Sequence, residues 1–235
     1  MNNLHCIVTG ATEGIGRAIA STLGRHGARV AVCARTAGRV SAVVEELTAE
    51  GVDAFGTSCD VGSEPSVTGF LQAARDRFGP VDVLVNNAGL AHFTPIEEMT
   101  VEAFDETFAV NVRGVFLMTR AVLPDMRSRG RGHIVNIASL AGRNPVPGAA
   151  AYAAAKHAVL GFSKSVFAEV RTEGVRVTTI CPGSVATPFF EKTGTGLEAP
   201  ERKLQAQDVA DTVLATLLLP ERALVSEVDL RPTNP

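Results

Sequence analysis

The stretch LHCIVTGATEGIG, from Leu4 to Gly16, opens the chain and decides its fold. Its first part, Leu4 to Val8, is a short apolar run that is typical of a buried strand. A glycine-rich turn, Thr9 to Gly16, follows at once, and the apolar periodicity after it predicts a helix that ends near Gly27. A strand, a glycine turn and a helix N-terminus together form a phosphate cradle, because free N–H groups and the helix dipole favour an anion.

The three glycines of this turn have different expected roles. Gly10 permits the tight turn, Gly14 lets the backbone approach a pyrophosphate, and Gly16 allows the helix to pack closely on the strand. Their spacing is GxxxGxG rather than GxGxxG. Such a turn is often only a turn, but its position between a strand and a helix favours dinucleotide binding. The predicted contacts in this turn are Gly10, Thr12, Glu13, Gly14, Ile15 and Gly16.

Apolar strands and amphipathic helices alternate along the rest of the chain. We predict strands over residues 4–9, 29–34, 54–59, 82–86, 132–138, 175–181 and 225–230, and helices over about 14–26, 37–50, 64–78, 101–128, 149–173 and 207–219. The pattern predicts an α/β fold with one doubly wound, seven-stranded parallel sheet and helices on both faces. We expect a single domain over residues 1–235, with a mobile loop at 188–200.

The composition excludes several classes of protein. A net charge of −3 gives no strong attraction to nucleic acid or to an anionic membrane. No apolar stretch approaches the roughly 20 residues that span a bilayer, and no signal peptide is recognised. Cys6, Cys33, Cys59 and Cys181 stand singly without a CxxC pair, as small buried hydrophobes do in a reducing compartment. We therefore expect a cytoplasmic protein without a metal site.

Tyr152 and Lys156 stand one helical turn apart in the string YAAAK. A lysine ammonium beside a phenol lowers the phenol pKa from its usual value of about 10, which suits general acid/base chemistry between a carbonyl and an alcohol. Taken alone, this spacing is more often a surface tyrosine that packs on a lysine stem. The other motifs of the chain favour the catalytic interpretation.

Four motifs occur in the order found in the short-chain dehydrogenase/reductase family, which the chain resembles from Leu4 to about Thr187. They are TGATEGIG, NNAG at Asn86–Gly89, Ser139 ahead of YAAAK, and Pro182–Gly183. The resemblance implies a Rossmann-like domain similar to NADP-preferring 3-oxoacyl reductases. It also implies an oxidoreductase that interconverts a carbonyl and a secondary alcohol by hydride transfer. The implied catalytic residues are Asn111, Ser139, Tyr152 and Lys156.

The end of the second strand, VAVCART, bears on the choice of cofactor. Ala34 stands where relatives that use NAD usually carry Asp, and the next residue, Arg35, can pair with a 2′-phosphate. NADP(H) is therefore favoured over NAD(H), although Arg35 could simply be solvated. Glu13 opposes this preference, because many NADP-using relatives have a basic residue there. The resemblance adds cofactor contacts at Asp60, Val61, Asn87, Ala88, Gly89, Tyr152, Lys156, Pro182, Gly183, Val185 and Thr187.

Several of these residues have an ordinary structural alternative. Asp60 could cap the next helix, and Ser139 ends a strand, where serine is ordinarily an N-cap or turn residue. Asn111 is a poor helix-interior residue, so we expect a buried kink that could hold a water molecule. Ala155 replaces the serine that most relatives have before the lysine, which should alter hydrogen bonding without abolishing activity.

The expected partner is a small carbonyl or alcohol substrate. A non-catalytic NADP-binding sensor is the alternative function, and such a protein would keep the glycine turn but lose the tyrosine or the lysine. Relatives pair the helices that correspond to 101–128 and 149–173 about a two-fold axis. These helices carry Phe104, Phe108, Phe116, Phe162 and Phe167, and we expect a homodimer or homotetramer held chiefly by them.

Overall fold

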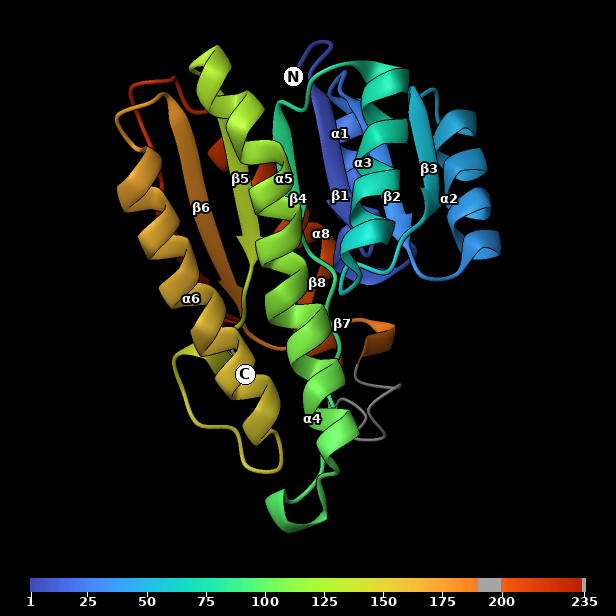
Figure 1. Ribbon diagram of the computed structural model, residues 1–235. Coiled ribbons are helices and arrows are strands. Elements are labelled where there is room, and N and C mark those ends of the chain that lie inside the picture. Colours follow the sequence, from blue (N-terminus) through green and yellow to red (C-terminus); the bar gives the residue numbers. More distant parts are fainter. Residues whose placement is uncertain (190–199, 234–235) are drawn as a thin grey trace.

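The computed structural model describes residues 1–189 and 200–233, and its centre is a seven-stranded sheet in which all pairs are parallel. The strand order is β3-β2-β1-β4-β5-β6-β9 (Figure 1). The strands are β1 (His5–Thr9), β2 (Arg29–Ala34), β3 (Ala54–Ser58), β4 (Val83–Asn86), β5 (Gly132–Ile137), β6 (Val175–Pro182) and β9 (Glu227–Leu230). The predicted strands and the parallel doubly wound sheet are confirmed.

Helices cover both faces of this sheet (Figure 1). They are α1 (Gly14–Arg25), α2 (Ala37–Ala49), α3 (Glu64–Phe78), α4 (Val101–Phe108), α5 (Gly114–Arg129), α6 (Ala150–Val170) and α8 (Ala206–Leu217). A short pair that the sequence did not predict, β7 (Val185–Ala186) and β8 (Leu204–Gln205), forms a second small sheet. Most predicted helix limits hold within one to three residues.

Alternation along the strands divides the core into two layers. Cys6 and Val8 of β1 pack in the cluster that contains Leu23 of α1 and residues of α2 and α8. Ile7, which lies between them, packs in the cluster that contains Phe70 of α3 and Met118 of α5. Successive side chains of a strand point to opposite faces, so continuous apolar strands are buried on both sides.

The strand order reverses at β1, which has β2 on one side and β4 on the other. Open α/β sheets bind ligands at such a switch point, beside the carboxyl ends of the strands. Thr9 closes β1 there, and its Oγ1 accepts hydrogen bonds from the backbone N–H groups of Asn87 and Ala88, at 3.0 Å each. The fold thus joins the glycine turn after β1 to the NNAG segment after β4.

A buried chain of amide groups fixes α6 against the sheet. Asn86 Nδ2 donates to Asn136 Oδ1 at 2.8 Å, and Asn136 Nδ2 donates to Ser163 Oγ at 2.8 Å. These bonds join β4, β5 and α6. Because Tyr152 and Lys156 belong to α6, their position relative to the strand ends is fixed as well.

The sequence predicted one continuous helix over 101–128, but the structure interrupts it. A π-helical turn, Ala109–Arg113, separates α4 from α5, and Asn111 lies buried within it. In Figure 1, α5 crosses in front of the sheet and α4 continues past the carboxyl ends of the strands. The irregularity expected at Asn111 takes the form of a π turn.

Among the described residues, no helix has the length and apolar character needed to cross a membrane, and no cluster of His, Cys, Asp and Glu could hold a metal ion. All four cysteines are buried and unpaired. The loop predicted at 188–200 falls largely on residues 190–199, outside the described part of the chain.

Candidate active site

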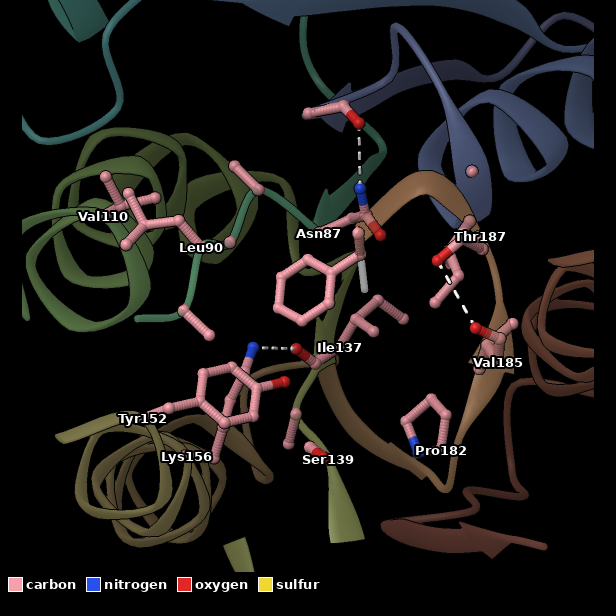
Figure 2. Close-up of a pocket in the computed structure, with 18 of the residues that line it drawn as sticks. Asn87, Leu90, Val110, Ile137, Ser139, Tyr152, Lys156, Pro182, Val185 and Thr187 are labelled. Atoms are coloured by element: carbon pink, nitrogen blue, oxygen red, sulfur yellow. Dashed lines mark hydrogen bonds between the residues drawn. The ribbon is translucent and has the colours of Figure 1, made fainter. Parts of the chain in front are cut away.

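A cavity of about 670 Å³ lies at the carboxyl ends of the strands and is lined by residues from each predicted motif (Figure 2). The predicted site residues that line it are Gly10, Thr12, Glu13, Gly14, Ile15, Arg35, Asp60, Val61, Asn87, Ala88, Gly89, Ser139, Tyr152, Lys156, Pro182, Gly183, Val185 and Thr187. Gly16 and Asn111 do not line the cavity. One cavity thus brings together segments that are far apart in the sequence.

Two glycines of the turn, Gly10 and Gly16, leave no room for a side chain. Gly10 has a φ of +65°, and a Cβ there would lie 2.7 Å from the Cα atom of Ala88. A Cβ on Gly16 would lie 2.4 Å from Gly10 O and from Asn87 Nδ2. The helix α1 begins at Gly14 without a side-chain capping bond from Glu13. Free N–H groups at a helix start beside an open cavity fit the phosphates of a dinucleotide.

Tyr152 and Lys156 project from α6 into the cavity, and Ser139 lies at its edge after β5 (Figure 2). Lys156 Nζ donates to Ile137 O at 3.0 Å and lies 5.6 Å from the centroid of the Tyr152 ring. Burial lowers the pKa of Lys156 to about 8. Since the phenol and the ammonium share one end of the cavity, both could act on the same ligand.

The predicted fall in the pKa of Tyr152 is wrong. Burial of the phenol raises the Tyr152 pKa to about 12, and hydrogen bonding from the Ser139 side chain opposes this rise only in part. The ammonium of Lys156 is turned toward the Ile137 carbonyl. Removal of the phenolate from water therefore outweighs the attraction of the nearby lysine.

Ser139 caps a short helix and also lines the cavity. Its Oγ accepts from the backbone N–H of Ala141 at 3.1 Å, which caps a short 3₁₀ helix, Leu140–Gly142. The same side chain lines the cavity near Tyr152. A serine hydroxyl can accept one bond and still donate its proton, so the cap leaves that proton available to the Tyr152 oxygen or to a ligand oxygen.

Asn111 has a buried acceptor without a hydrogen-bond partner among the described residues. Its Nδ2 donates to Leu90 O and Thr107 O, at 2.8 Å each, whereas its Oδ1 has no partner. A Cβ on Gly89 would lie 2.9 Å from this Oδ1 and 3.6 Å from Lys156 Nζ. Both polar atoms therefore border the space beside Gly89, which suits a bound water molecule.

Two arginines lie at the end of the cavity formed by β2 and α2. Arg35 Nη1 donates to Glu106 Oε1 at 2.9 Å, and Arg39 Nη1 donates to Glu13 Oε2 at 3.5 Å. The sequence reasoning missed Arg39 and Glu106. Arg39 could have been noticed as a basic residue one helical turn beyond Arg35. Glu106 is distant in the sequence, and only the fold brings it close to Arg35.

The alternative role of Asp60 as a helix cap is wrong. Asp60 Oδ1 accepts from the backbone N–H of Gly62 at 2.9 Å, which closes a local turn, and the N-cap of α3 is Ser63. Asp60 and Val61 both line the cavity. Their predicted place beside an adenine is compatible with this position.

Two phenylalanines that the sequence reasoning missed flank the tyrosine. The ring centroids of Phe93 and Phe189 lie 6.4 and 5.9 Å from that of Tyr152. Leu140 and Val146 also line the cavity. Both phenylalanines lie outside the motifs and the periodic elements, so no sequence pattern marked them.

Comparison with known proteins agrees with this geometry. Residues 4–198 match the family model described as short chain dehydrogenase. The chain belongs to the short-chain dehydrogenase family. As a short-chain dehydrogenase it is an oxidoreductase, and the family predicted from its motifs is confirmed.

Similar short-chain dehydrogenases include one curated relative and two solved structures. A protein of Streptomyces virginiae, named as a candidate ketoacyl reductase of the monensin polyketide synthase, is 45% identical over 195 residues, 82% of this chain and 75% of the relative. An alcohol dehydrogenase from the archaeon Thermococcus sibiricus, complexed with 5-hydroxy-NADP, has a TM-score of 0.91 and 33% identity, with 99% of this chain and 97% of that chain covered. An actinorhodin polyketide ketoreductase variant with NADPH has a TM-score of 0.90 and 37% identity, with 97% and 96% covered.

Proposed function

We propose that this short-chain dehydrogenase interconverts a carbonyl compound and a secondary alcohol with NADP(H), and that Tyr152 is the general acid/base. The observation that carries the proposal is the convergence of Ser139, Tyr152 and Lys156 at one end of a cavity whose other end is the glycine turn. When bound, the nicotinamide supplies or accepts the hydride, and the protein supplies orientation and proton transfer.

In the direction of reduction, Tyr152 donates a proton to the carbonyl oxygen. A phenol with a pKa of about 12 is protonated at neutral pH and is ready to act as an acid. Ser139 donates its hydroxyl proton to the same oxygen and stabilises the negative charge that develops on it. In the direction of oxidation, the same two side chains hold the alcohol, and Tyr152 accepts its proton.

Lys156 and a water molecule held by Asn111 would return a proton to Tyr152. The Lys156 ammonium favours the phenolate that forms during the reaction and is well placed to bind the ribose beside the nicotinamide. A water molecule on Asn111 Oδ1, in the space beside Gly89, would link Lys156 to solvent. The buried and unpaired acceptor of Asn111 supports this assignment.

The adenosine end of the cavity favours NADP(H) over NAD(H). Arg35 and Arg39 both line it, and guanidinium groups bind phosphate through charge-assisted bonds. The short-chain dehydrogenase structures described above contain 5-hydroxy-NADP and NADPH, in agreement with this preference. Glu13, which opposed the preference in the sequence, forms an ion pair with Arg39 at 3.5 Å.

The substrate that fits best is a 3-oxoacyl-like or other apolar ketone. Phe93 and Phe189 lie beside Tyr152, and the apolar side chains of Leu140 and Val146 also line the cavity. The similarity to polyketide ketoreductases supports a ketone on an acyl chain. A homodimer or homotetramer in the cytoplasm completes the proposal, and the four unpaired cysteines agree with a reducing compartment.

The test of the function is Tyr152→Phe, measured as NADPH oxidation with a panel of activated ketones and as NADPH binding by fluorescence. We expect turnover to fall by about 10²–10⁴-fold, because general acid help is lost, and binding to stay almost unchanged. A variant that retains half the wild-type turnover would contradict the role of Tyr152. A wild-type protein that binds NADPH but reduces no ketone would favour the sensor.

The test of the cofactor is Arg35→Asp. It exchanges a phosphate partner for a partner of the ribose hydroxyls, and it adds repulsion toward a 2′-phosphate. We expect binding of NADPH to weaken far more than binding of NADH. A wild-type protein that already prefers NADH would show that Arg35 does not select the cofactor.

A further inference from the structure

Glu106 of α4 uses both carboxylate oxygens to join two segments of the cavity wall. Its Oε1 accepts from Arg35 Nη1 at 2.9 Å, and its Oε2 lies 3.2 Å from His92 Nε2. Arg35 follows β2 at the adenosine end of the cavity, and His92 precedes Phe93, which lies beside Tyr152. Glu106 itself does not line the cavity.

The position of Glu106 matters because Arg35 is the side chain through which we propose that the protein selects a 2′-phosphate. A phosphate monoester carries about −1.5 to −2 charges at neutral pH and needs donors from the same guanidinium. Glu106 already uses one donor of Arg35 and neutralises its charge. Hydrogen bonds from Arg35 and His92 lower the pKa of Glu106, so the carboxylate stays ionised at working pH.

The two contacts also hold Glu106 in place. A carboxylate on a single partner could rotate away when a phosphate arrives, but His92 also binds the second oxygen of Glu106. The second arginine at this end is engaged in a similar way, because Arg39 pairs with Glu13 at 3.5 Å. A 2′-phosphate therefore meets two arginines that already have carboxylate partners.

We propose that Glu106 is a specificity-determining residue that competes with the 2′-phosphate for Arg35 and so limits the preference for NADP(H) over NAD(H). This inference rests on the proposed function, because it assumes that Arg35 binds the phosphate. Glu106 acts through Arg35 and is not a catalytic residue. Its removal should strengthen binding of 2′-phosphorylated ligands and leave other adenosine ligands unaffected.

The experiment measures binding of two small probes by calorimetry, adenosine 2′,5′-bisphosphate and adenosine 5′-monophosphate. The test variant is Glu106→Gln, which keeps the size of the side chain and removes its charge. We expect the bisphosphate to bind about twofold to fivefold more tightly, the size of effect expected for an exposed ion pair. Binding of the monophosphate should not change.

Glu102→Gln is the matched control, because Glu102 is an exposed residue of the same type one turn earlier on α4. It removes the same charge without touching Arg35, so its affinities for both probes should equal those of the wild type. An equal gain in the control would show a general effect of charge and would overturn the inference. Thermal melting of each variant shows whether it is folded.

The remaining outcomes separate the inference from the proposed function. A wild-type protein that binds both probes equally contradicts the preference for NADP(H) itself. Suppose that the wild-type protein prefers the bisphosphate but Glu106→Gln binds it no more tightly, or less tightly. The preference for NADP(H) then stands, and the inference about Glu106 is wrong. In an Arg35→Ala background the gain from Glu106→Gln should nearly vanish, and a full gain there would show that Glu106 does not act through Arg35.

Discussion

At the scale of single residues, Lys156 lines the cavity, and the burial of its charge reduces the free energy of unfolding. Burial lowers its pKa from 10.5 to about 8, so the folded chain binds the proton less tightly than the unfolded chain does. Below pH 8 the lysine is charged in both states, and the full cost of burying the charge is present. As pH rises from 8 to 10.5 the folded protein gains stability from this group, because the unfolded chain then binds more protons.

Lys156→Met should therefore stabilise the protein while it removes activity. At about 1.4 kcal/mol for each pKa unit, the shift sets an upper limit of roughly 3 kcal/mol, and the lost bond to Ile137 O reduces it. We expect Tm at pH 7 to rise by about 2–6 °C. Thermal melting between pH 7 and 10 should show this gain shrinking as pH rises. A Tm at pH 7 that is lower for the variant than for the wild type would show that burial of the Lys156 charge does not destabilise the protein.

The sequence predicted which residues gather at the site but not their protonation. Tyr152, Lys156 and Ser139 were found because their spacing is local and follows a family pattern. The pKa of Tyr152 is raised, whereas the sequence predicted that it would be lowered. Burial of the phenol causes the rise, and burial depends on packing by segments that are distant in the sequence. For the same reason Glu106, 71 residues from Arg35 in the sequence, could not be linked to it in advance.

At the scale of elements, the glycine turn depends on helix α1 approaching β1 closely. Two glycines inside helices differ in this respect: a Cβ on Gly16 would lie 2.4 Å from Gly10 O, whereas a Cβ on Gly69 in α3 would meet nothing within 4 Å. The first position requires glycine for packing. The second carries only the entropic cost of glycine in a helix.

We predict opposite effects for Gly16→Ala and Gly69→Ala. Gly16→Ala should lower Tm and weaken NADPH binding, because the added methyl group separates α1 from the turn. Gly69→Ala should raise the free energy of unfolding by roughly 0.5–1 kcal/mol and leave binding unchanged. Chemical denaturation and fluorescence titration measure both. Equal Tm shifts in the two variants would refute the packing argument.

Most elements could be predicted from the sequence because each strand coincides with an apolar run and each helix with a stretch of helical periodicity. The exceptions have physical reasons. The π turn at Ala109–Arg113 lies inside an uninterrupted helical pattern, and only the unfavourable Asn111 marked it. The strands β7 and β8 have two residues each, too few to show a period.

At the scale of the whole molecule, the predicted interface helices expose part of their aromatic surface. Phe104 and Phe116 are each 41% exposed, and Phe108 stacks on Phe104 with 4.7 Å between ring centroids. Phe162 and Phe167 instead pack against the core, so their prediction as interface residues is not supported by exposure. The exposed apolar side chains on α4 and α5 agree with a subunit interface there.

We expect the wild type to be a dimer or tetramer by light scattering at micromolar concentration, and Phe116→Glu to lower its mass toward the monomer value of 24.6 kDa. Burial of a carboxylate at an interface costs more free energy than a nearby charge such as Arg120 usually returns. Ala42→Glu is the control, because it adds the same charge to an exposed position on α2, on the other face of the sheet. A wild-type monomer with full activity would rule the interface out.

The π turn between α4 and α5 also has a consequence for chain length. A π turn contains one more residue than an α-helical path, and each residue of an α-helix turns the chain by about 100°. Deletion of Ala109 alone would leave the residue count of one continuous helix from Val101 to Arg129 and would remove the wide turn in which Asn111 lies, whereas an inserted residue would turn the side chains of α4 by about 100° relative to α5. Insertions and deletions of a single residue in this segment should therefore be tolerated far less well than substitutions on its exposed face.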